Sequence, residues 1–158
     1  MKIGVISDTH ISDSSKKIPE DIANIFFNVD LIIHAGDLTN ICITEELNSI
    51  AKTEAVRGNM DDDSNCLPIK KILDISNFKI GIIHGYGAPQ DIRNRIKKEF
   101  PPVDVIIYGH THTPYNKVED GILFFNPGSP TDKRFSPYNS VGILEIQDRK
   151  ITGEIIKL

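Results

Sequence analysis

The sequence predicts an α/β fold of four layers, in which two mixed sheets pack face to face and helices cover the outside of each sheet. Short apolar runs typical of strands alternate with segments whose apolar residues recur at helical spacing. Toward the C-terminus strand-like segments outnumber helical ones, and a second sheet would bury them. The length of 158 residues and the apolar content of 39% are ordinary for one globular domain, so residues 1–158 are expected to form a single domain.

The first half of the chain has the pattern of a β-α-β-α-β unit. A strand at residues 2–6 is followed by a helix that starts at Pro19 and buries Ile22, Ile25 and Phe26, which follow i, i+3, i+4 spacing. The remaining elements of this half are a strand at 30–34, a helix at 45–51 for which Thr44 is a candidate N-cap, and a strand at 54–57.

The second half of the chain is richer in hairpins. Two apolar runs, 70–75 and 78–83, flank Ser76-Asn77, which is a two-residue turn signal and predicts an antiparallel pair. A third helix is expected to start at Pro89 and to bury one apolar face. The other expected elements are a strand at 103–108, a hairpin at 117–125 that turns at Asp120-Gly121, and a last strand pair, 141–146 and 151–158, that turns around Asp148.

Composition argues against several classes of protein. The net charge of −4 disfavours bulk electrostatic binding of nucleic acid, although a single phosphodiester held by metal ions remains compatible with it. We expect a cytoplasmic protein with no membrane partner, because no apolar run approaches membrane-spanning length and no secretory leader precedes the first strand. Cys42 and Cys66 lack a paired spacing and are expected to be free or structural thiols.

Polar residues that can bind metal follow several of the apolar runs. The carboxyl ends of strands are where ligands bind in α/β sheets, so these side chains are expected to converge on one edge. Each motif is weak alone, since Gly-Asp and Gly-Asn are common turn pairs and a lone histidine is usually a packing residue. Gly109-His110-Thr111-His112 is the strongest local signal. The candidate metal ligands are Asp8, His10, Asp37, Asn59, His84, His110 and His112.

In this order the motifs resemble those of the calcineurin-like metallophosphoesterases, from Lys2 to about Ser129. The similarity is greatest to the small single-domain phosphodiesterases, to which the retromer scaffold subunit is related in fold. The resemblance implies two metal ions with Asp37 as the bridging ligand. One ion would be held by Asp8, His10, Asp37 and His112, and the other by Asp37, Asn59, His84 and His110.

The charge of such a centre suits phosphodiester hydrolysis. Two divalent ions against the carboxylates of Asp8 and Asp37 leave about two positive charges, enough to attract a phosphodiester anion and a hydroxide. We therefore expect a metal-dependent phosphodiesterase whose nucleophile is a metal-bridging hydroxide. Asp37, Asn59 and His84 are the expected catalytic residues, and Asn59 is also expected to bind substrate. Nitrogen and oxygen ligands suit Mn, Ni, Fe or Zn, and the resemblance favours Mn.

One position departs from the family pattern. Most phosphatases of this family carry a histidine directly after the asparagine of the motif, where it binds phosphate and is proposed to protonate the leaving group. Met60 stands there and can do neither. General acid catalysis contributes about 10²- to 10⁴-fold, so we expect activity on activated phosphodiesters and weak activity on alkyl phosphomonoesters. The neighbouring Asp61, Asp62 and Asp63 are expected to form a solvated acidic loop.

Three further features have competing interpretations. Asn126-Pro127-Gly128-Ser129 resembles a loop of the small phosphodiesterases that lines the site, but it fits a turn at a strand end equally well. His34 lies outside the ligand set and is expected to pack or to support a ligand. Lys133 and Arg134 either steer an anionic substrate or are ordinary surface charge.

Two alternatives to the hydrolase remain open. The first is a non-catalytic metal-binding or protein-interaction scaffold on the same fold, although a scaffold could lose ligands and every ligand position here holds a competent residue. The second is a nuclease, which the acidic balance and the lack of an aromatic-rich basic groove disfavour. The expected partner is a small phosphodiester, and a homo-oligomer is compatible with the sequence.

Overall fold

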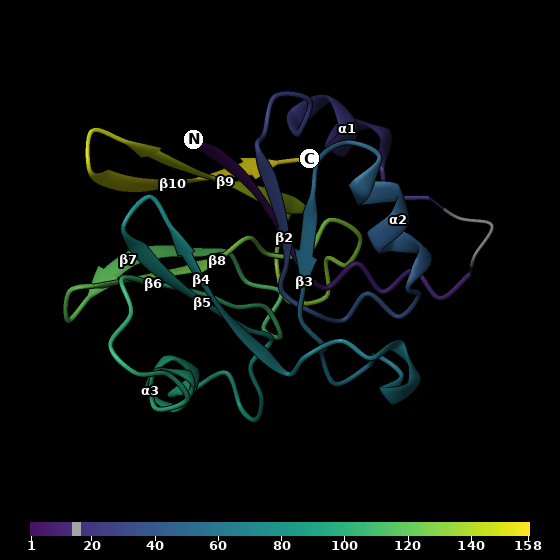
Figure 1. Cartoon of the computed structure of the whole chain (residues 1–158). Helices are drawn as coiled ribbons and strands as arrows, with labels where there is room; N and C mark the ends of the chain where they lie inside the picture. Colours follow the sequence, from purple (N-terminus) through teal and green to yellow (C-terminus); the bar gives the residue numbers. More distant parts are fainter. Residues whose placement is uncertain (14–16) are drawn as a thin grey trace.

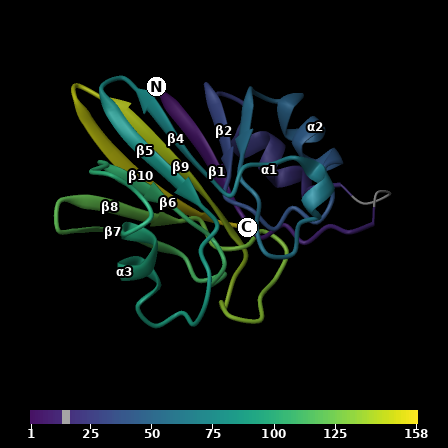
Figure 2. The same cartoon turned by 60° about the horizontal axis from the view of Figure 1, so that its bottom comes forward.

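Two mixed five-stranded sheets pack face to face in the computed structural model, which describes residues 1–13 and 17–158 (Figure 1). The first sheet has the order β10 (Lys150–Lys157), β9 (Ser140–Gln147), β1 (Lys2–Ile6), β2 (Leu31–His34), β3 (Thr53–Ala55). The second has the order β4 (Lys70–Ile75), β5 (Phe78–Ile83), β6 (Val105–Ile107), β8 (Ile122–Asn126), β7 (Tyr115–Glu119). Helices α1 (Glu20–Ile25) and α2 (Cys42–Asn48) cover the first sheet, and α3 (Ile92–Lys97) covers the second (Figures 1 and 2). This arrangement confirms the predicted fold class.

Apolar contacts between the layers explain why the strands read as continuous apolar runs. Ile33 of β2 and Ile82 of β5 are buried in the cluster between the two sheets. Ile32, the neighbour of Ile33, faces the opposite side and packs in the cluster with Phe26 and Leu47 at the first two helices. Strands that are covered on both faces need apolar residues at consecutive positions, which is the pattern of the central strands here.

The predicted hairpins are confirmed. β4 pairs antiparallel with β5, β7 with β8, and β9 with β10. Ser76 and Asn77 adopt φ angles of 49° and 71°, the left-handed values that a two-residue hairpin turn with the right twist requires. Asp148 and Arg149 adopt 49° and 61° for the same reason.

The second helix differs from the prediction. It begins at Cys42 rather than Glu45, and Thr44 lies inside it, where its hydroxyl donates to the carbonyl of Ile41 at 2.6 Å. The Asn40 side chain accepts the N–H of Cys42 at 3.0 Å and so turns the chain into the helix one turn earlier. In the part of the chain that the structure describes, none of the helices has the length and apolar content needed to cross a bilayer.

Candidate metal centre

Loops from both sheets bring the predicted ligands to one end of the sandwich. β1, β2 and β3 are parallel, and so are β5 and β6, so the loops that follow the strands of each set leave their sheet at the same edge. The first sheet contributes Asp8 and His10 after β1, Asp37 after β2 and Asn59 after β3. The second sheet contributes His84 after β5, and His110 and His112 after β6.

The backbone at most of these positions is left-handed. Positive φ is uncommon for residues other than glycine, costs of order 1–3 kcal/mol at each position, and clusters at functional sites. A run of such residues at a single edge therefore indicates that the loops are shaped to aim their side chains. The φ values are 55° for Asp8, 47° for His10, 57° for Asp37, 67° for His110 and 54° for His112.

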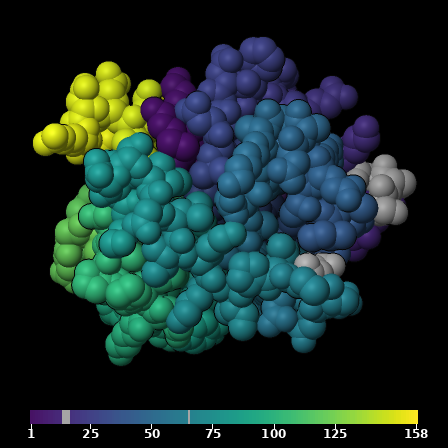
Figure 3. All heavy atoms as spheres, viewed as in Figure 1, coloured from purple at the N-terminus to yellow at the C-terminus, as the bar shows by residue number. Residues whose placement is uncertain are grey.

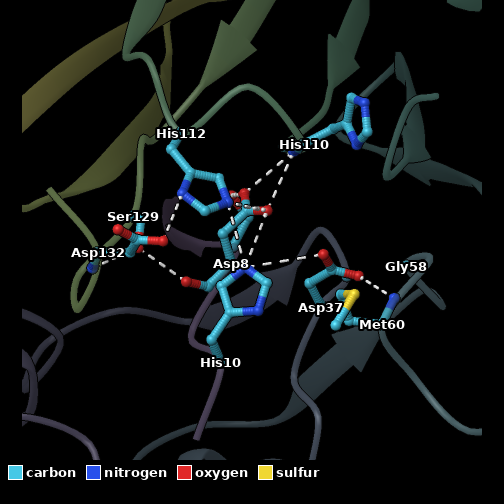
Figure 4. Close-up of polar contacts among 12 residues, drawn as sticks. Asp8, His10, Asp37, Gly58, Met60, His110, His112, Ser129 and Asp132 are labelled. Carbon is cyan, nitrogen blue, oxygen red and sulfur yellow. Dashed lines mark hydrogen bonds and ion pairs between the residues drawn. The ribbon is translucent and has the colours of Figure 1, made fainter. Parts of the chain in front are cut away.

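Five of the seven predicted ligands direct their polar atoms at one another. Figure 4 labels four of them, Asp8, His10, Asp37 and His112. Asp8 Oδ1 lies 3.3 Å from His112 Nε2, and Asp37 Oδ2 lies 3.3 Å from His84 Nε2. His10 Nε2 lies 3.1 Å from His112 Nε2. Atoms bound to one ion at about 2.1 Å are about 3.0–3.4 Å apart in octahedral or tetrahedral geometry, so this spacing suits a transition metal.

The chemistry of these atoms also fits a cation. The Nε2 atom of His84 is buried and has no hydrogen-bond partner among the described residues, although buried polar atoms are nearly always paired. The facing nitrogens of His10 and His112 can share only one proton, whereas a cation could accept both lone pairs. The carboxylates of Asp8 and Asp37 are both buried and would gain a compensating charge. The donor set of carboxylates and imidazoles suits divalent transition metals.

Asp8 is the carboxylate common to two candidate ligand groups. Asp8, His10 and His112 form one group, and Asp8, Asp37 and His84 form the other, with ligand atoms within 4.8 Å of one another in each. The sequence resemblance implies Asp37 as the bridge instead. The geometry leaves room for both, since Asp37 Oδ2 also lies 3.7 Å from His10 Nε2.

Asn59 and His110 lie at the rim and do not join the other five ligand atoms. Asn59 Oδ1 lies 3.1 Å from His110 Nδ1, and His110 Nε2 lies 2.8 Å from the carbonyl of Gly87. The imidazole of His110 points away from the carboxylates (Figure 4). Its backbone N–H nevertheless donates to both oxygens of Asp8, at 3.2 and 3.1 Å. Binding a metal through these two side chains would require both to rotate.

Groups behind two of the histidines orient their rings. Nδ1 of His84 lies 2.8 Å from the carbonyl of Ala35, so Nδ1 carries the proton and Nε2 faces the centre. Nδ1 of His112 lies 3.2 Å from Oδ2 of Asp132. Arg134 Nε donates to this same oxygen at 2.8 Å, and Arg134 Nη2 forms an ion pair with it at 2.6 Å. The Arg134 hydrogen bond holds the pKa of Asp132 at about 2, so the carboxylate stays ionised. The sequence motifs did not identify Asp132 as part of the site. Arg134, which the sequence offered as a residue that steers substrate or as surface charge, is paired with Asp132.

Asp61 corrects the expectation of a solvated acidic loop. Its carboxylate is largely buried and accepts the backbone N–H groups of Asp37 at 2.9 Å, Thr39 at 2.7 Å and Gly58 at 2.8 Å. It thereby fixes the loop of Asp37 against the loop of Asn59. Nothing in the local sequence distinguishes it from Asp62 and Asp63, which are exposed.

The segment Asn126–Ser129 supports the ligand loops from beneath. Asn126 and Ser129 are buried, and the Asn126 amide donates to the carbonyl of Gly109 at 2.9 Å. The Ser129 hydroxyl donates to the carbonyl of Asp8 at 2.8 Å. His34 has a similar role, because its Nε2 lies 3.2 Å from the Thr9 hydroxyl. Burial lowers the pKa of His34 to about 4, so the ring is neutral near pH 7.

The protonation of the ligands reflects their mutual contacts. Burial by itself would raise the pKa of Asp37, but the imidazole of His84, whose Nε2 lies 3.3 Å from Oδ2, and the N–H of Met60 hold it below its usual value. Burial by itself would lower the pKa of His84 and of His112, but Asp37 and Asp8 raise them. A divalent cation here would compete with protons on these imidazoles, so its binding should release protons.

Comparisons with known proteins identify the family of this chain. Residues 1–149 match the family described as the calcineurin-like phosphoesterase superfamily domain. A probable metallophosphoesterase of Methanocaldococcus jannaschii is 45% identical over 161 aligned residues, which cover 100% of this chain and 82% of that protein.

Two solved structures share the whole fold. A single mutant of Vps29 from Entamoeba histolytica has a TM-score of 0.78 at 26% identity. The alignment covers 100% of this chain and 99% of the Vps29 chain. An archaeal protein described as a novel phosphodiesterase has a TM-score of 0.77 at 27% identity and covers 99% of this chain and 100% of that chain. With the family match, these similarities confirm the resemblance seen in the motifs. The chain belongs to the calcineurin-like phosphoesterase superfamily.

Proposed function

We propose that this chain is a metal-dependent phosphodiesterase with two divalent ions, of which Mn is the expected one. The observation that supports this most is the convergence of Asp8, His10, Asp37, His84 and His112, from four loops on two sheets, with the buried Nε2 of His84 unpaired within the described residues. The archaeal structural neighbour described as a phosphodiesterase favours the same substrate class. When bound, two ions would activate a water near neutral pH and stabilise the attacking and leaving oxygens.

The side chains have separable roles in this proposal. Asp8 and Asp37 supply the negative charge that retains the cations, and the neutral imidazoles fill coordination positions without cancelling the remaining positive charge. Asn59 is exposed beside His84 and can donate its amide N–H to a phosphate oxygen. Ala35 and Asp132 orient the rings of His84 and His112. Residues 1–158 are proposed to act as one domain.

Met60 limits the leaving groups that the site can expel. Its backbone N–H donates to Asp37 Oδ1 at 2.7 Å, and its side chain is 59% exposed. A thioether cannot donate a proton to an alkoxide, so esters whose leaving groups are already acidic should react best. Activated phosphodiesters are therefore the preferred test substrates.

The direct test is hydrolysis of bis-p-nitrophenyl phosphate by chelator-stripped protein with Mn, Ni, Zn or Mg added back. Turnover should appear with added metal and disappear in Asp37→Asn, whereas Asp74→Asn, an exposed carboxylate paired with Lys79, should match the wild type. Turnover without metal, or turnover that Asp37→Asn leaves intact, would contradict the proposal.

A protein-interaction scaffold is the second candidate, and the similarity to Vps29 favours it. The two functions differ in a simple observable. A scaffold of this fold would bind metal without metal-dependent turnover of any phosphodiester.

A further inference from the structure

A surface cavity of about 290 Å³ opens directly beside the proposed metal ligands. Asn59 and His84 form part of its lining, so a phosphate held at the metal centre would have one of its ester groups at the mouth of this cavity. The rest of the lining comes mainly from Ile69, Ile83 and Tyr86. Figure 3 shows that the teal residues, from about 66 to 100, form a continuous surface on the face of the molecule that it draws.

The walls of this cavity are apolar and partly open to solvent. Ile69 is 61% exposed and Tyr86 is 46% exposed, while Ile83 is buried. Large exposed apolar side chains gathered around one concave surface are typical of ligand sites, whereas single ones scattered over a surface are ordinary. Arg57 and Glu99 add polar groups to the same lining.

Tyr86 is held in place by hydrogen bonds of its hydroxyl and of its backbone carbonyl. Its hydroxyl donates to Glu99 Oε1 at 2.9 Å, and Lys70 Nζ donates to Glu99 Oε2 at 2.9 Å. Its carbonyl accepts from Arg95 Nε at 3.2 Å. A ring that is already ordered loses little conformational entropy when a ligand packs against it, so it makes a better stacking surface than a free side chain.

We propose that this cavity binds a planar aromatic ester group of the substrate, a nucleobase or an aryl ring, while the phosphate lies at the metal ligands. This assignment rests on the proposed function, because it places the phosphate at the metal centre. The volume suits one ring system, since sites for complete drug-sized ligands are about 300–1,000 Å³. Stacking on Tyr86 and contact with Ile69 favour a flat aromatic group over a small alkyl group.

The test first measures binding of phosphonates, which carry a single organic group on a P–C bond that cannot be hydrolysed as an ester. Phenylphosphonate, cyclohexylphosphonate and methylphosphonate are titrated calorimetrically into the full chain loaded with Mn. Phenylphosphonate should bind about tenfold more tightly than methylphosphonate and also more tightly than cyclohexylphosphonate, as expected for stacking on one aromatic side chain. The binding of adenosine 5′-monophosphate is then compared with that of ribose 5-phosphate. Tighter binding of adenosine 5′-monophosphate would identify a nucleobase as the occupant of the cavity, and tighter binding of phenylphosphonate alone would identify an aryl ring.

Matched variants attribute the preference to the cavity. Tyr86→Ala and Ile69→Ala should each reduce the phenyl preference several-fold. Tyr86→Phe keeps the ring but loses its hydrogen bond to Glu99, so it should keep most of the preference, and Phe27→Ala, which removes an exposed ring elsewhere, should keep all of it. The Mn affinity of each variant should equal that of the wild type.

Equal binding of phenyl- and methylphosphonate, or a preference that Tyr86→Ala and Ile69→Ala leave intact, would overturn the inference. Turnover of bis-p-nitrophenyl phosphate without any ring preference overturns this inference alone. A ring preference without turnover overturns the proposed function and leaves the cavity assignment standing.

Discussion

Asp132→Asn should weaken metal binding, because Asp132 acts on the centre through His112. The substitution keeps the shape of the side chain, but it removes the charge that lies 3.2 Å from Nδ1 of His112. It also removes the ion pair with Arg134. The imidazole becomes a poorer electron donor and its orientation is less strongly fixed.

The expected loss is about tenfold in metal affinity. The 3.2 Å contact, the imidazole ring and a nitrogen–metal bond of about 2.1 Å place the carboxylate about 7 Å from the ion. At that distance a unit charge and a divalent ion interact by roughly 1 kcal/mol in water and about 5 kcal/mol at an effective dielectric constant of 20. The lower value applies best, because Arg134 already neutralises Asp132 in part, and about 1.4 kcal/mol corresponds to tenfold.

Competition of chelator-stripped protein against a chromophoric chelator measures this affinity without any turnover. Asp74→Asn is the control, since it removes an exposed carboxylate from an ion pair remote from the centre. Wild-type affinity in Asp132→Asn, or the same loss in both variants, would refute the reasoning.

The remaining predictions concern Met60, His34 and Asp61. Met60→His should raise kcat for poor leaving groups by up to about 10²- to 10⁴-fold and change kcat for p-nitrophenyl esters little; equal gains on both would count against the missing-acid explanation. His34 has a folded pKa of about 4 against 6.5, so its contribution to stability is present above pH 6.5 and lost as the pH falls toward 4, by roughly 3 kcal/mol in total. Urea unfolding at pH 7 and pH 5 in chelator should show that His34→Gln lacks this part of the pH dependence, and an unchanged dependence would exclude it. Asp61→Asn should lower the free energy of unfolding by about 1.5–3 kcal/mol because it weakens three hydrogen bonds, two of them buried, whereas Asp74→Asn should leave urea unfolding nearly unchanged; similar small effects in both would deny Asp61 its supporting role.

The fold was largely predictable because its signals are local. Ser76-Asn77 specifies a turn within two residues, and the consecutive isoleucines of β2 specify burial on both faces. The start of α2 was misplaced because Asn40, rather than Thr44, directs the chain into the helix.

The candidate centre was predictable only as a set of residues. The ordered motifs identify which side chains can bind metal, but not which point inward, and the outward ring of His110 depends on a contact with Gly87. Asp61 and Asp132 were missed for a related reason. The partners that tie them to the site, the N–H of Asp37 and the ring of His112, belong to other loops, so their spacing along the chain carries no signal.

The origin of the ligands in two different sheets has a mechanical consequence. The loops of the first sheet supply Asp8, His10 and Asp37, and the loops of the second sheet supply His84 and His112. A cation bound by both sets would link the two sheets through coordination bonds at the edge where the ligand loops lie. Elsewhere the sheets are held together by the apolar side chains between them. The two sheets could then separate only after the ion is released, so the ion would stabilise the folded state. At a free ion concentration 100 times its dissociation constant, the free energy of unfolding would rise by about 2.7 kcal/mol.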